Sequence, residues 1–153
     1  MADELELKIQ QGARNKDGIF RLSQLYKKPF RFIRESDGFR IYAVDGEWVR
    51  NNLAVRHEDK GFEHAGHGLV HEFIPLDEIW VDTNHFEGCP CLNVGKDRKI
   101  SQKFFESTAL HEIIEFRIMN LGLPYKIAHE LALWVEKKIG ILKDPYTEEY
   151  DKD

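Results

Sequence analysis

The length, composition and charge of the chain limit what it can be. Its 153 residues are 42% hydrophobic and 32% charged, with a formal net charge of -5, which predicts one domain with a substantial core. The acidic balance argues against general binding to nucleic acids or anionic membranes, because phosphate groups attract an excess of Lys and Arg. No apolar run approaches the ~18 residues of a membrane span. Residues 1–8 are too charged for a signal peptide, so we expect a cytoplasmic location.

The order of patterns along the chain predicts four parts within a single domain over residues 1–153. These parts are an N-terminal segment (1–28), a sheet with loops (29–99), a helical pair that carries the candidate site (100–140) and a tail (141–153).

The patterns in the first part of the chain mainly predict strands. Alternating leucine and isoleucine over residues 5–9 predicts an edge strand, and the apolar spacing in 19–26 predicts a short helix. Two alternating runs within residues 30–43 flank an Asp-Gly pair, which predicts a β-hairpin. The run 48–53 fits either a helical turn or the start of a strand.

The middle of the chain alternates between polar and apolar segments. Residues 56–68 are polar and contain glycine, which predicts a loop. The apolar residues Leu69, Val70, Phe73 and Ile74, which Pro75 follows, predict a strand, and residues 78–82 predict a second, compact one. Residues 83–99 look irregular.

The two cysteines of the chain, Cys89 and Cys91, flank Pro90. One intervening residue is too short for an ordinary disulfide, and the spacing is not that of a C-x-x-C redox motif. The simpler interpretation is two free thiols in a tight turn. The alternative is a metal site that these thiolates form with His85.

Two helices are predicted after residue 100. Ser101 is a suitable N-cap for a helix that runs to residue 121, Gly122 fits the C′ position, and Pro124 fits the first turn of a second helix that ends near residue 139. So short a link makes the helices antiparallel neighbours. The expected fold class is α+β, with a small, mainly antiparallel sheet followed by a C-terminal antiparallel helical pair.

The first of these helices carries the pattern with the clearest chemistry. Residues four apart lie on one face of an α-helix, so His111 and Glu115 project together, with Glu112 on the flank. Two ligands at this spacing, with a carboxylate beside the first, form the arrangement of a zinc hydrolase helix. The usual second ligand is histidine, whereas this chain has Glu115.

The second helix supplies a third candidate ligand. Counted from the turn, His129 lies about as far along its helix as Glu115 lies back along the first, so His111, Glu115 and His129 are predicted to reach one metal ion. Three protein ligands and an open position are typical of a catalytic zinc site. Glu136, two turns later, is a reserve ligand. The alternative is a solvated helix face with ordinary ion pairs and half-buried histidines.

The motifs around these residues resemble those of a group of small bacterial and phage proteins that look like zincin metallopeptidases. They are Leu110-His111-Glu112-x-x-Glu115 and Gly122-x-x-Tyr125-x-x-Ala128-His129, together with Gly66-His67 and the segment from Phe73 to Asp82 upstream. The resemblance covers roughly residues 45–136. It implies a zincin-like fold and a zinc cofactor. It also implies an edge strand beside the active helix that binds peptide substrate, for which Glu78–Asp82 is the candidate.

The remaining histidines are dense in one segment. For His57 and His64 we favour a solvated loop, whereas His67 and His71 could face the helices. His67 is a candidate catalytic residue, either as a donor to the transition state or as an alternative ligand, and the solvated loop remains open for it too. Asp82 is predicted to accept a hydrogen bond from a ligand histidine.

Three functions fit these patterns. The first is a zinc-dependent hydrolase, a peptidase or amidase, in which a metal-activated water attacks the substrate and Glu112 is the general base. The second is a catalytically inactive zincin-like module that binds another protein, with or without metal. The third is a plain folded domain without metal. The expected partner is a protein or peptide, with neither nucleic acid nor membrane.

Overall fold

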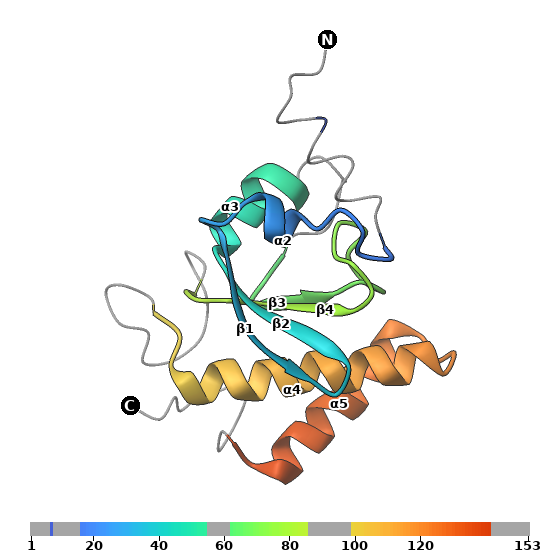
Figure 1. Ribbon diagram of the computed structural model, residues 1–153. Helices are drawn as coiled ribbons and strands as arrows, with labels where there is room; N and C mark the ends of the chain where they lie inside the picture. The colour runs from blue at the N-terminus through green and yellow to red at the C-terminus, as the bar shows by residue number, and fades with distance from the viewer. Residues whose placement is uncertain (1–6, 8–15, 55–61, 86–98, 142–153) are drawn as a thin grey trace.

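A computed structural model describes residues 7, 16–54, 62–85 and 99–141 of the protein. It is an α+β fold in which a four-stranded sheet precedes a C-terminal helical pair, as predicted (Figure 1). No described helix is both long and apolar enough to cross a membrane. In chain order the elements are α2 (Leu22–Leu25), β1 (Phe30–Ser36), β2 (Phe39–Val44), α3 (Gly46–Val49), a π-helical turn (Arg50–Ala54), β3 (Ala65–His67), β4 (Glu78–Asp82), α4 (Gln102–Asn120) and α5 (Tyr125–Ile139).

The sheet is mixed, with strand order β1-β2-β4-β3. β1 and β2 form the predicted antiparallel hairpin, in which Asp37 and Gly38 adopt φ values of 57° and 86°. Positive φ at two consecutive turn residues matches the twist of a two-residue hairpin, which explains the Asp-Gly pair. β2 and β4 are parallel, and β3 adds to β4 as a short antiparallel edge strand.

Side chains from both faces of the sheet are buried, which gives a three-layer arrangement. Alternate residues of β2 and β4 point to opposite faces. Tyr42 and Trp80 pack on the side of α2 and α3, whereas Ile41, Ile79 and Val81 pack against α4. Figure 1 shows these layers, with the sheet between the short helices and the C-terminal pair. Because both faces are covered, the middle residues of β4, Ile79 to Val81, are all apolar, and the charged Glu78 and Asp82 stand only at its ends.

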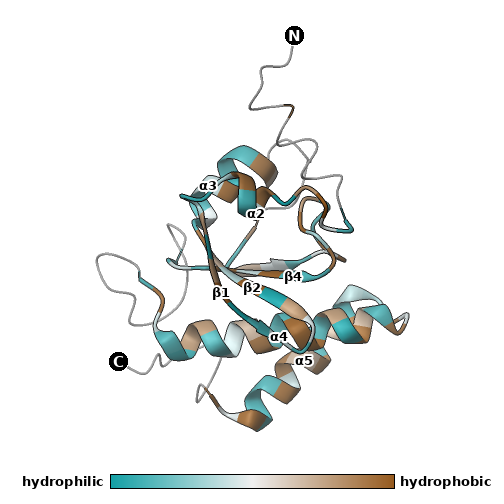
Figure 2. Ribbon diagram, viewed as in Figure 1, coloured by the Kyte–Doolittle hydropathy of each residue, from teal (hydrophilic) through white to brown (hydrophobic). Residues whose placement is uncertain are grey.

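The helical pair forms as predicted. The Ser101 side chain accepts a hydrogen bond from the Phe104 backbone N–H and starts α4, and Gly122 after its end has φ 106°. Pro124 is the N-cap of α5. α5 turns back beneath α4 (Figure 1) and buries Ala128 and Ala132 there. Hydrophobic and hydrophilic residues alternate along both helices (Figure 2).

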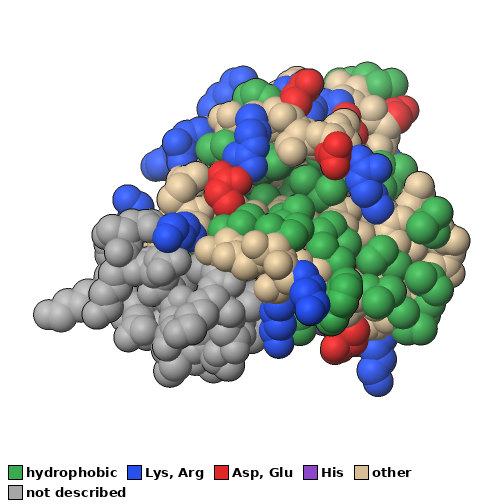
Figure 3. All heavy atoms as spheres, turned by 90° about the horizontal axis from the view of Figure 1, so that it is seen from below, with side chains coloured by type: hydrophobic (Ala, Val, Ile, Leu, Met, Phe, Trp, Pro, Cys, Tyr) green, Lys and Arg blue, Asp and Glu red, His purple; other side chains and the backbone are tan. Residues whose placement is uncertain are grey.

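The opposite side of α5 exposes large apolar side chains. Hydrophobic side chains gather on the underside of the molecule (Figure 3), and those of α5 that are exposed include Ile127, Leu131, Trp134 and Ile139.

Two expectations for the middle of the chain are wrong. Residues 69–74 are turns and not a strand, because the backbone forms local hydrogen bonds, with the His71 N–H donating to the His67 carbonyl.

The ammonium group of Lys16 holds these turns together. It donates to the carbonyls of Gly68, His71 and Ile74. The strand lies instead at Ala65–His67, inside the predicted loop 56–68.

The expected edge strand is also wrong. Glu78–Asp82 pairs with β2 on one side and β3 on the other, so it is an interior strand, and β3 is the edge beside α4. The expected helix within 19–26 is confirmed as α2, and the run 48–53 is helical. The predicted strand at 5–9, apart from the exposed Leu7, and the two cysteines, His57 and most of the tail lie outside the described residues.

The turn after β3 depends on a glycine at position 68. A Cβ there would lie 2.7 Å from the Ile74 carbonyl oxygen and 2.9 Å from that of Pro75. Gly68→Ala should therefore displace the turn and lower the free energy of unfolding by about 1–3 kcal/mol, measured by urea denaturation. Leu69→Ala, which shortens a neighbouring side chain that is 37% exposed, is the control and should cost less. Equal losses would show that the close approach does not constrain residue 68.

Candidate metal centre

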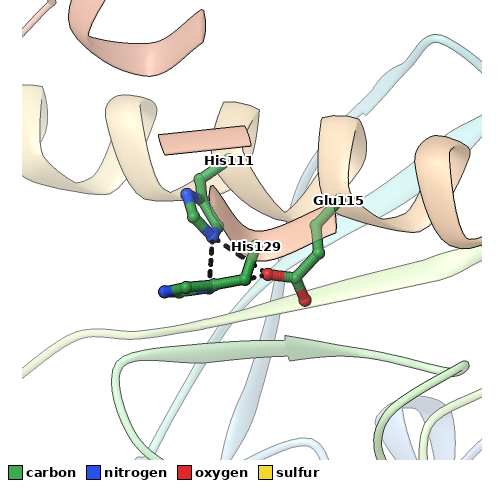
Figure 4. Close-up of side chains that lie close together, drawn as sticks. All are labelled: His111, Glu115 and His129. Atoms are coloured by element: carbon green, nitrogen blue, oxygen red, sulfur yellow. Dashed lines mark hydrogen bonds and ion pairs between the residues drawn. The ribbon is translucent and has the colours of Figure 1, made fainter. Parts of the chain in front are cut away.

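Three predicted ligands meet between the two long helices. His111 and Glu115 project from α4 one turn apart, and His129 projects toward them from α5 (Figure 4). His111 and Glu115 are buried and His129 is partly exposed. The short link at Gly122 brings His129 level with Glu115, so the predicted convergence of these three side chains is confirmed.

The three ligand atoms form a nearly equilateral triangle. Glu115 Oε2 lies 3.0 Å from His111 Nε2 and 3.0 Å from His129 Nδ1, and the two nitrogens are 3.2 Å apart. Bonds of ~2.0–2.2 Å in a tetrahedral zinc site separate ligand atoms by roughly 3.3–3.6 Å. Side-chain shifts of a few tenths of an ångström would therefore seat an ion.

The hydrogen bonds of His111 decide which nitrogen faces the triangle as an acceptor. His111 Nδ1 lies 3.0 Å from Glu136 Oε2, and the Ser107 hydroxyl donates to Glu136 Oε1 at 2.7 Å. A carboxylate only accepts hydrogen bonds, so Nδ1 carries the hydrogen and Nε2 of neutral His111 presents a lone pair. Glu136, the predicted reserve ligand, thus contacts the ring nitrogen of His111 that faces away from the triangle. Ligand histidines are commonly held by an acceptor at this position.

The triangle therefore needs a positive charge at its centre. A carboxylate oxygen and a lone pair on His111 cannot satisfy one another, and His129 Nδ1 can supply at most one hydrogen. Without a metal, a second proton on His111 meets the need. Burial lowers the pKa of His111, but hydrogen bonds to Glu115 and Glu136 and nearby negative charges raise it to about 10. A divalent cation would replace that proton, so the donor set fits a metal ion.

A second group of potential ligands consists of His67, Glu112 and Glu115, whose atoms lie within 4.8 Å of one another. The buried His67 contacts Glu115 Oε1 through Nε2 at 2.8 Å, and the Leu69 backbone N–H donates to its Nδ1 at 3.2 Å. Because Nδ1 accepts, the hydrogen of neutral His67 is on Nε2 and points at Glu115. His67 and Glu115 therefore already form a hydrogen bond with each other, so this group fits a metal less well than the triangle.

Glu112 is a buried carboxyl group of the second cluster, and it shares Glu115 with the triangle as a neighbour. Its carboxyl has no hydrogen-bond partner within the part of the chain that the structure describes. Burial, followed by the negative charge of Glu115, raises the pKa of Glu112 to about 7. A carboxylate with this pKa can both take and give a proton near neutral pH.

Tyr125 lies against a residue of the triangle, a contact that was not predicted from the sequence. Its ring stacks on His129 with a centroid distance of 5.5 Å and an interplanar angle of 25°, and the side chain is 46% exposed. Burial and the charges of Glu115, Glu112 and Glu63 raise its pKa to about 12, so the phenol stays protonated. The signal was the spacing from Tyr125 to His129, one turn apart at a helix start.

The other predicted residues lie elsewhere. Asp82 was expected to contact a ligand histidine, which is wrong: its carboxylate accepts hydrogen bonds from the Gly46 and Asn84 backbone and pairs with Arg50. His71 is buried beside Phe62 and Phe73. His64 and His85 lie together against Phe104, and burial lowers the pKa of His64 to about 4.

Comparison with known proteins finds no matching family model, curated protein or solved structure. The function of the chain is therefore inferred from the site itself.

The raised pKa of Glu112 predicts how stability depends on pH in protein freed of metal by a chelator. Its folded-state pKa of about 7 exceeds the ordinary 4.5, so the stability that its protonated form contributes is complete below pH 4.5 and is lost as the pH rises through 7. Glu112→Gln should remove this loss and be more stable than the unmodified protein at pH 8, on the order of 1 kcal/mol.

The measurement is thermal unfolding from pH 4.5 to 8. Glu130→Gln removes a carboxylate from an exposed position of α5 and is the control. A Glu112→Gln curve parallel to that of the unmodified protein would contradict a raised pKa.

Proposed function

We propose that the protein is a zinc-dependent hydrolase with a zincin-like fold, which cleaves peptide or other amide bonds. The observation that carries this proposal is the ligand triangle of His111, Glu115 and His129 next to Glu112, a buried carboxyl without a hydrogen-bond partner among the described residues. A purely structural cluster would be expected to satisfy such a carboxyl.

The donor set favours zinc over harder cations. Two imidazole nitrogens and one carboxylate oxygen are a common ligand set of catalytic zinc, whereas Mg²⁺ and Ca²⁺ prefer oxygen alone. A zinc ion bound there would polarise a substrate carbonyl and lower the pKa of a bound water.

Glu112 is the proposed general base. It neighbours His111 in sequence but projects from α4 about 100° around the helix, so it can reach a water at the site without sharing the direction of His111. Its carboxylate takes a proton from the attacking water as the new C–O bond forms. It then delivers that proton to the leaving nitrogen as the C–N bond breaks.

Tyr125 and β3 are the proposed contacts to the substrate. The half-exposed phenol of Tyr125 keeps its proton and can donate a hydrogen bond to a substrate oxygen. β3 is an edge strand that contacts α4, and an extended peptide can add to such an edge through its backbone. This proposal moves the peptide-binding role from Glu78–Asp82 to Ala65–His67.

The metal proposal predicts about one zinc per chain in protein purified without a histidine tag, measured by plasma mass spectrometry. Glu115→Ala and His129→Ala should each lose it, because two ligands bind too weakly to hold zinc through dialysis. Glu130→Ala, adjacent to His129 but exposed, should keep it. Metal-free unmodified protein that takes up no added zinc would refute the proposal.

The catalytic proposal predicts that Glu112→Gln retains zinc but cleaves a peptide library about 10²–10⁴-fold more slowly. Loss of zinc in this variant would mean that Glu112 is a ligand, and full activity would exclude it from the mechanism. If the unmodified protein binds zinc but cleaves no peptide or amide, the inactive protein-binding module is the better description.

A further inference from the structure

We propose that His67 is a positioning residue that makes Glu115 bind metal through a single oxygen. This inference rests on the proposed metal site. It concerns a contact between the sheet and α4 that the motif of α4 does not contain.

A continuous series of contacts fixes the direction of each group. The Leu69 backbone N–H donates to His67 Nδ1, so the hydrogen of the neutral ring lies on Nε2. That N–H donates to Glu115 Oε1 at 2.8 Å, while Oε2 of the same carboxylate lies in the ligand triangle. The two oxygens of Glu115 are thus assigned to different partners.

The surroundings of His67 hold its ring in this orientation. Its side chain is fully buried on β3, and the ring of Phe116 packs edge-on against it at 5.5 Å. The neighbouring Gly66 and Gly68 leave no room for a Cβ, because His71 and the carbonyl of Ile74 approach them closely. Full burial, the ring of Phe116 and the Leu69 N–H on Nδ1 therefore hold the ring with Nε2 toward Glu115.

This arrangement has two consequences for a metal ion in the triangle. A free carboxylate can bind through both oxygens and occupy two coordination positions, whereas a carboxylate held by His67 at Oε1 offers one. The hydrogen bond also draws negative charge away from Oε2, so Glu115 behaves more like a neutral ligand and the ion remains a stronger Lewis acid. His67 would therefore keep a coordination position open and offset the effect of a carboxylate where histidine is usual.

The hydrogen on His67 can be observed directly in the unmodified protein. Nitrogen-15 NMR of the histidine rings, with zinc bound, should show a protonated Nε2 and an unprotonated Nδ1 for His67. Loss of the Nε2 hydrogen when zinc is added would show that His67 is itself a ligand and would overturn the proposal.

Two substitutions test whether the hydrogen bond from residue 67 to Glu115 is needed, or whether any polar side chain at this position is enough. His67→Gln places an amide N–H near the position of Nε2, whereas His67→Asn reaches only the position of Nδ1. His67→Asn should bind zinc about 10- to 100-fold more weakly, the cost typical of losing a group behind a ligand, and His67→Gln should stay close to the unmodified protein. Competition with a chromophoric chelator measures the affinity.

Cobalt spectra give a second readout that a general loss of stability would not change. With Co²⁺ in place of zinc, His67→Asn should absorb visible light more weakly, because binding by both oxygens of Glu115 raises the coordination number, and His67→Gln should not. Equal zinc affinity and equal spectra in all three proteins would overturn the role of His67 and leave the metal site standing. Absence of zinc binding in the unmodified protein would instead refute the proposed function, and this role with it. If neither variant folds, the NMR measurement decides.

Discussion

The charge of the Glu115 carboxylate is the constraint on which this part of the molecule depends. It is 2% exposed, and three imidazoles contact it, from α4 itself, from α5 and from β3. A buried carboxylate is costly unless charge and hydrogen bonds compensate it. Because the compensating groups come from three elements, neither the helical pair nor the edge of the sheet can shift without leaving part of this charge unpaired. The geometry of the site and the packing of these elements therefore both depend on compensating the Glu115 charge.

The same constraint links protons to metal. His111 faces Glu115 with one nitrogen and Glu136 with the other, and both neighbours favour its protonated form, which outweighs the effect of burial. A cation in the triangle would take the place of that proton, so binding should release it, as metal binding to histidine sites generally does. Either a proton on His111 or a cation in the triangle would thus compensate the charge of the cluster. Preformed ligands of this kind lower the ordering cost of binding.

The features that could be predicted from the sequence are those set by residues close together in the chain. The spacing of His111 and Glu115 and the glycine and proline of the link are local, and they sufficed to place His129 opposite Glu115. The three-residue strand at Ala65–His67 is too short for a period, and its pairing with β4 is not local. The strand predicted at 69–74 was wrong because Phe73 and Ile74 are buried within turns as completely as in a strand. The contacts of Asp82 and Glu136 are made with residues distant in the chain. The sequence therefore predicted a position on a strand or helix for each, but not its partner.

If Glu115 binds metal as proposed, its carboxylate needs a different kind of support from the one that a histidine in its place would need. A histidine there would bind metal with one ring nitrogen and donate a hydrogen bond with the other, so its support can be any acceptor. A glutamate accepts at both oxygens, so its support must be a donor. β3 supplies one in His67, whose own hydrogen is placed by the Leu69 backbone. The carboxylate on α4 and the histidine on β3 therefore act as a pair. An interpretation of the helix motif alone would treat Glu115 as a defect, whereas with His67 it is half of a complementary contact.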